Sequence, residues 1–363
     1  MNTTFKDAFQ NQTYIVNPWY DNLFFLMMPL FAFLIALTTP YWAYTNIHFG
    51  DDQVPAFAVA FLLIEIAGGS GLIRAYLNPK IFKRFWFVFT VVPILLFCAL
   101  YISLWVVVIA ITIDLLWDIV HTTMQTFGIS KFYDQKHGNN TEIGRRQDIM
   151  LNYVIYAGPI FLHLGFISES QAFDYLELFD FTHTTGIAAI PLWLEEHSLN
   201  IAAITIIVSA VVIVNYFFTF RKLVKNNEYK LCSSKIILLS TTAFCTYTIW
   251  QFNDFLMAFL ATNIFHAAQY FALVWYSEKD NISKILHVEK LKYHGLIVFA
   301  FFFAFATAMA VAFLAAEYQF YDADDLSAME GLSGVIIRLW IVIGLLHYWH
   351  DRFIWSSKKI NRE

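Results

Sequence analysis

The sequence predicts an all-α polytopic membrane helix bundle, with about ten transmembrane helices and both termini in the cytoplasm. Of its 363 residues, 59% are hydrophobic and only 14% are charged, and the mean hydropathy is +0.56. Soluble proteins carry about a quarter charged residues. Aromatic residues, at 19%, suit lipid-facing surfaces and membrane interfaces. We therefore expect residues 1–363 to form a single integral membrane domain whose first partner is the lipid bilayer, and we expect no nucleic-acid partner.

The first half of the chain contains five of the expected helices. Residues 22–42 and 54–77 are single apolar runs of the roughly 20 residues that a membrane-spanning helix needs. The run 85–128 is about twice that length, so we expect two helices that turn near Tyr101–Leu104. The run 147–168 follows a basic polar segment and is long enough for one more helix.

The second half contains the other five. Residues 199–220 form one run, and 236–276 is again too long for a single helix. The polar residues in Gln251–Phe255 predict a turn within that run. The runs 293–316 and 333–355 complete the bundle.

The distribution of the 23 lysines and arginines supports this topology. Counting Arg352 at the end of the last helix, all of them except Arg74 and Arg338 fall in segments expected on the inner side. The segments expected outside contain none and are acidic, as the positive-inside rule requires. The longest of these, 169–198, is expected to be an extracytoplasmic loop or cap. The polar N-terminus is not typical of a cleavable signal peptide.

Three histidines lie deep inside the predicted helices, each with a polar residue within one helical turn, at His121, His266 and His347. Ionisable groups are costly in hydrocarbon and therefore mark functional sites. Each lies roughly 7 to 10 residues above the inner end of its helix, or about 10–15 Å at 1.5 Å per residue. Glu65 lies at a comparable level. A single histidine of this kind is often only structural, but three at one depth favour a shared site.

The first of these histidines belongs to a polar stripe. Asp114, Asp118, His121 and Gln125 are spaced by four, three and four residues, which places them on one helical face. This face crosses an otherwise apolar helix.

The other two histidines have polar companions as well. Asn263, His266 and Tyr270 share a face, with Gln269 beside it. In the last helix, His347 is followed by His350 and Asp351 at i+3 and i+4, which is the most ligand-like local pattern.

Imidazoles and carboxylates contributed by several helices are typical of transition-metal sites, and we predict iron before zinc or haem. The three cysteines are far apart, so a thiolate site is not expected. The predicted metal ligands are His121, His266, His347, His350, Asp118, Asp351 and Asp114. The predicted substrate or proton-handling residues are Gln125, Gln269, Tyr270, Glu65 and Arg74.

Three remaining features have structural interpretations. Arg74 and Arg338 are expected to pair with Glu65 or an anionic substrate, and Arg74 is equally expected to extend to the inner interface instead. The glycine-rich run 68–71 indicates close helix packing. His163 is expected to be structural.

We predict a membrane-embedded, metal-dependent oxidoreductase of the oxygenase or desaturase type. It would act on a lipophilic or small substrate and use an electron-donor protein. The HxxxH and HxxHH clusters that membrane desaturases and hydroxylases carry are absent from the sequence, so no family is assigned.

Three alternatives stay open. Facing histidines also hold haem in membrane redox proteins. The same ligands on zinc would activate water in a membrane hydrolase. Without a metal, the polar stripe would serve as the relay of a proton-coupled transporter.

Overall fold

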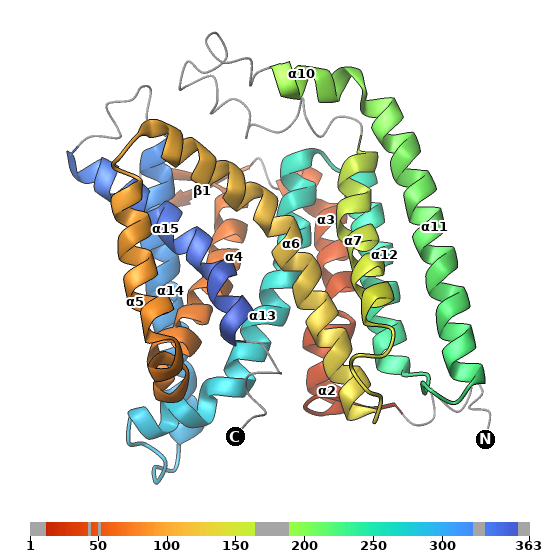
Figure 1. Cartoon of the computed structure of the whole chain (residues 1–363). Coiled ribbons are helices and arrows are strands. Elements are labelled where there is room, and N and C mark those ends of the chain that lie inside the picture. The colour runs from red at the N-terminus through yellow and green to blue at the C-terminus, as the bar shows by residue number, and fades with distance from the viewer. Residues whose placement is uncertain (1–11, 43–44, 50–51, 164–188, 322–330, 355–363) are drawn as a thin grey trace. The chain divides into compact units, whose positions relative to one another are not determined.

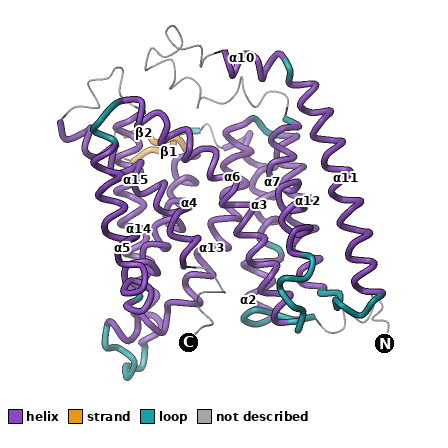
Figure 2. The backbone as a smooth tube through the Cα atoms, in the orientation of Figure 1, coloured by secondary structure: helices purple, strands orange, loops and turns teal. Residues whose placement is uncertain are grey.

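The computed structural model describes residues 12–42, 45–49, 52–163, 189–321 and 331–354. Helices account for most of the described chain (Figure 2). The described strands are a single short hairpin, in which β1 (Asn46–Phe49) pairs antiparallel with β2 (Asp52–Pro55). The predicted helical fold class is confirmed at this level.

The helices follow the predicted apolar runs. In chain order they are α2 (Pro18–Asp21), the π-helical segment η1 (Asn22–Leu26), α3 (Met28–Trp42), α4 (Ala56–Leu72), the π-helical segment η2 (Ile73–Leu77), α5 (Pro79–Ala99), α6 (Leu104–Lys136), α7 (Arg145–Leu162), α10 (Ala189–Glu196), α11 (Ser198–Lys225), α12 (Ser233–Phe252), α13 (Phe255–Ile285), α14 (His294–Tyr321) and α15 (Gly331–Ile354). Both long runs break where expected, between α5 and α6 and between α12 and α13.

Several predicted boundaries differ from the structure: α5 begins at Pro79, before the predicted 85, and α6 and α13 extend to Lys136 and Ile285, past the predicted 128 and 276. The helix expected from residue 54 begins at Ala56, because Val54 and Pro55 belong to β2. Residues 164–168 of the fifth predicted helix, and 169–188 of the predicted cap, lie outside the described residues. The described part of that cap is α10 and the start of α11.

Five helices of the described chain are long and apolar enough to cross a membrane. They are α5, α11 and most of α6, α13 and α14. The segment Pro18–Leu26 and the following Met28–Thr39 pass the same test as one span that is bent by 44°. Several long apolar helices of this kind are compatible with a membrane protein.

The chain divides into two compact units. Unit 1 comprises residues 1–56 and 119–266, and unit 2 comprises 57–118 and 267–363. One division falls after the first residue of α4, and the other two fall inside α6 and α13, so each of these two helices contributes one part to each unit.

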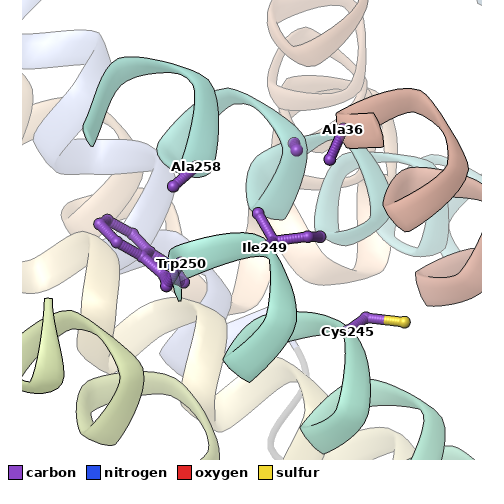
Figure 3. Packing of buried hydrophobic residues seen from close by; sticks show 6 residues of the cluster. Ala36, Cys245, Ile249, Trp250 and Ala258 are labelled. Atoms are coloured by element: carbon purple, nitrogen blue, oxygen red, sulfur yellow. The ribbon is translucent and has the colours of Figure 1, made fainter. Parts of the chain in front are cut away.

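In unit 1, α7 packs along α11 and α12, and α12 packs along α3 (Figure 1). Figure 3 shows part of the resulting core, where side chains of α3, α12 and α13 meet. The labelled residues are Ala36, Cys245, Ile249, Trp250 and Ala258. His163 ends α7, and its Nδ1 lies 2.8 Å from the carbonyl oxygen of Trp250.

In unit 2, α15 packs along α5 and α14. The predicted close packing at the glycine-rich run is visible at Gly69, where an added Cβ would lie 2.9 Å from the carbonyl oxygen of Ala306. Arg338 supports the turn between α5 and α6, because its Nε donates to the carbonyl oxygen of Leu100 over 3.1 Å. Its guanidinium also lies 4.2 Å from the ring centroid of Tyr101.

Candidate functional site

Two buried histidines meet inside unit 1. His121 of α6 and His266 of α13 are each 7% exposed, and their ring centroids are 4.9 Å apart with ring planes at 78°. Gln125, one turn after His121, donates from Nε2 to the carbonyl oxygen of His266 over 2.9 Å. This hydrogen bond ties α6 to α13 beside the imidazoles. The structure thus brings together three of the predicted site residues.

The ring separation can be compared with metal coordination. A ligating imidazole nitrogen lies about 2.0–2.1 Å from the metal, and the ring centroid lies about 1.1 Å further away. Two imidazoles at roughly 90–110° on one ion therefore have centroids roughly 4.5–5.2 Å apart. The observed 4.9 Å falls in that range. The centroid separation therefore matches two imidazoles on one metal ion, and it also lies in the range of edge-to-face ring packing.

A second polar group lies in unit 2. Tyr270 of α13 donates from its hydroxyl to Oδ1 of Asp351 on α15 over 2.7 Å. The ring of His347, also on α15, lies 5.1 Å from the Tyr270 ring in an edge-to-face arrangement. A Cβ at Gly71 would lie 2.5 Å from the Tyr270 hydroxyl oxygen, so the glycine leaves the room that this hydroxyl occupies.

Carboxylates of unit 2 gather near α15, on the face that carries Gly344 and Tyr348. A Cβ at Gly344 would lie 3.1 Å from Oδ1 of Asp114, so this carboxylate lies against the α15 backbone. The Tyr348 hydroxyl is directed at Oδ1 of Asp118 over 3.4 Å. Glu65 also lies within electrostatic range of Tyr348. The two aspartates and the two α15 residues are each spaced i, i+4, so one helical face meets another.

His350 has different surroundings from those that the sequence led us to expect. It is 2% exposed, and its ring lies edge-on to Phe89 at 4.5 Å and to Tyr76 at 5.8 Å. His347 and His350, the predicted ligand pair, share a helical face, but their rings contact different residues. The His347 ring contacts Tyr270, whereas the His350 ring contacts Phe89 and Tyr76. Aromatic packing therefore accounts for much of the His350 environment.

The remaining predicted residues are also buried. Gln269 is 0% exposed. Arg74 of η2 pairs with Glu278 of α13, a partner that was not predicted from the sequence. Asn78 and Asn281 also donate to Glu278, over 3.0 and 3.3 Å.

A buried ionic network of unit 1 was not anticipated from the sequence. Lys235 at the start of α12 bonds to Asp134 of α6 and Asp148 of α7, with 2.8 Å to each, and its side chain is 2% exposed. Lys131 pairs with the same two carboxylates. The hydroxyls of Tyr229 and Tyr216 donate to Asp134 and Asp148, respectively. Two lysines and two aspartates therefore balance in charge inside the protein.

The sequence held little signal for this network. Its lysines and aspartates lie near helix ends that were predicted from the sequence to be on the inner side, where the positive-inside rule leads one to expect solvated charge. The i, i+3 spacing of Lys131 and Asp134 was the one local sequence pattern that indicated an ion pair of this network.

The loops beside the network contain groups with shifted pKa values. Burial, followed by the nearby charge of Asp134, raises the pKa of the Tyr229 hydroxyl. Burial also raises the pKa of the Cys232 thiol. Burial and then the positive charge of Lys230 lower the pKa of His137, against smaller opposite effects.

No known family model matches this chain, and neither a curated protein nor a solved structure is detectably similar to it.

Proposed function

We propose that this chain is a metal-dependent oxidoreductase embedded in a membrane, with a transition metal, iron in the first place, held by His121 and His266. The observation that carries the proposal is the 4.9 Å separation of two buried imidazoles from two apolar helices. Neutral imidazole is a common ligand of iron and zinc. Two protein ligands leave coordination positions for oxygen and substrate.

The same separation argues against a haem bound between these two rings. Imidazoles on opposite faces of a haem would place their centroids about 6.4 Å apart, if each nitrogen lies about 2.0–2.1 Å from the iron. The rings of His121 and His266 are 4.9 Å apart and at 78° to each other. Two adjacent coordination positions on a non-haem metal ion fit this ring separation and angle better.

The surroundings of the proposed site suggest its substrate class. His121 and His266 lie on the two helices α6 and α13, which are long and apolar enough to span a bilayer. A site in such helices is reached from hydrocarbon, so we propose a lipophilic or small substrate. An electron-donor protein would supply reducing equivalents from the inner side.

The proposal includes the full topology of about ten spanning helices with both termini in the cytoplasm. It is supported by the breaks at 100–103 and 253–254 and by the distribution of lysine and arginine. Reporter fusions after residues 142, 227 and 289 should all report the cytoplasm, and fusions within 169–188 should report the outside. An outside signal at residue 227 would contradict the topology.

The metal proposal is tested by the metal content and visible spectrum of the detergent-purified full chain. The variants are His121→Ala and His266→Ala, with His163→Ala as the control, since His163 bonds to a backbone carbonyl of unit 1. We expect iron in the wild type and the control, its loss from both site variants, and no haem spectrum.

The other outcomes are also informative. Zinc in place of iron would contradict the redox proposal and favour the hydrolase. Metal-free wild type, after purification without chelators, would overturn the metal site and favour the transporter.

A further inference from the structure

We propose that Tyr270 is a redox-active tyrosine whose proton is accepted by Asp351 when the phenol loses an electron. The proposal adds a step to the proposed oxidoreductase function. It rests on that function because the oxidant would be the one-electron-oxidised metal ion. It assigns to unit 2 a role in moving electrons and protons.

The hydrogen bond is the first observation. The Tyr270 hydroxyl donates to a carboxylate oxygen of Asp351 over 2.7 Å, the usual length for an O–H···O bond. A phenol becomes a strong acid when it loses an electron, so its oxidation is rapid only when a base is already hydrogen-bonded to its hydroxyl and can accept the proton. A hydrogen-bonded carboxylate is such a base.

The second observation is the protected position of the ring. Tyr270 is 2% exposed and packs among Ile73, Val274 and Phe302. Gly71 leaves the space for its hydroxyl, and the His347 ring lies 5.1 Å from its ring centroid. Burial of this kind keeps water and other reductants away from an oxidised ring.

The third observation is the position of Tyr270 along α13. It follows His266 by four residues, which is about 6 Å along the helix axis. Tyr270 therefore follows a proposed metal ligand by about one helical turn.

Four other tyrosines of the described chain also donate to aspartates, namely Tyr133, Tyr216, Tyr229 and Tyr348. Asp134 and Asp148, the acceptors for Tyr229 and Tyr216, each pair with two lysines. Asp21, the acceptor for Tyr133, also accepts the backbone N–H of Ile15 over 2.6 Å. Such partners stabilise the carboxylate anions of Asp21, Asp134 and Asp148.

The step balances in charge and atoms. The Tyr270 phenol loses one electron to the oxidant and one proton to Asp351, which leaves a neutral tyrosyl radical and a neutral carboxylic acid. The O–H bond of Tyr270 breaks, a new O–H bond forms on Asp351, and the oxidant is reduced by one electron. An electron from the donor protein reverses both changes.

The test uses a ruthenium(III) polypyridyl oxidant, generated by a light flash, on the full-length protein in detergent. Tyrosyl radical is followed by electron paramagnetic resonance and by optical absorbance. Because exposed tyrosines also react, the signal of interest is the difference between wild type and Tyr270→Phe. The matched control is Tyr247→Phe, since the Tyr247 hydroxyl donates to the backbone carbonyl of Val154 over 3.0 Å.

We expect a long-lived radical that is lost in Tyr270→Phe and kept in Tyr247→Phe. In Asp351→Asn its formation should slow by about 10²-fold, and Asp351→Glu should restore most of the rate. An unchanged radical in Tyr270→Phe, or an unchanged rate in Asp351→Asn, would overturn the proposal. Because the oxidant is external, a metal-free protein that still forms the Tyr270 radical would refute the metal site alone.

Discussion

Removal of Lys235 tests the energetic role of the buried ionic network most severely. In Lys235→Met the side-chain volume is nearly kept, but the ammonium that bonds to Asp134 and Asp148 is lost. The network then changes from two cations and two anions to one cation and two anions, all inside unit 1. An unbalanced buried carboxylate is costly, so we expect strong destabilisation.

The magnitude follows from the distances. At 2.8 Å and an effective dielectric constant of about 20, each of the two contacts of Lys235 has a Coulomb energy of about 6 kcal/mol. Most of this is offset, because the ammonium no longer has to be desolvated. Loss of one partner from a buried pair typically costs about 3–5 kcal/mol, which is the net effect that we expect.

The assay is thermal or denaturant unfolding in detergent. At about 2–4 °C per kcal/mol for a unit of this size, the unfolding temperature should fall by roughly 6–20 °C. Lys225→Met, at an exposed lysine in the last turn of α11, is the control and should cost less than about 1 kcal/mol. The double variant Lys235→Met, Asp148→Asn restores the charge balance and should be more stable than Lys235→Met alone. A single variant within about 1 kcal/mol of wild type would refute this reasoning.

Two further predictions concern a loop histidine and the helix packing. Because burial lowers the pKa of His137, its contribution to stability should be fully present above about pH 6.5 and lost as the pH falls through the folded-state pKa. A histidine NMR titration should show that Lys230→Met raises this pKa, and an unchanged value would contradict the assigned role of the lysine charge. Gly69→Ala should cost about 1–3 kcal/mol in unfolding experiments, because the new methyl group meets the backbone of α14. Gly128→Ala, with open space at its Cβ, should instead stabilise α6 by up to about 1 kcal/mol, and equal effects at the two glycines would argue against this packing.

The sequence predicted the helices well because apolar runs and their polar interruptions carry a strong signal. The turn before α6 and the break before α13 both lie where the sequence placed them. His121 and His266 were recognisable because histidine is rare in apolar helices, and the structure brings their rings together.

Other features depended on tertiary contacts that no local pattern encodes. Glu278 lies in a charged stretch expected at the inner surface, yet it is buried and pairs with Arg74. Lys235 and Asp148 are 87 residues apart in sequence, so their contact was invisible to spacing arguments. The i, i+3 spacing of His347 and His350 suggested a ligand pair. In the structure, the His350 ring lies against the aromatic side chains of Phe89 and Tyr76, which no spacing along α15 could predict.

X-ray absorption spectroscopy at the edge of the bound metal tests the central claim most directly, because it reports the ligands themselves. We predict a non-haem iron spectrum with two imidazole ligands at about 2.0–2.2 Å. His266→Ala loaded with the same metal should show fewer imidazole ligands, and His163→Ala should match the wild type. A haem spectrum, a shell of thiolate sulfur, or an imidazole count unchanged in His266→Ala would contradict a metal held by His121 and His266.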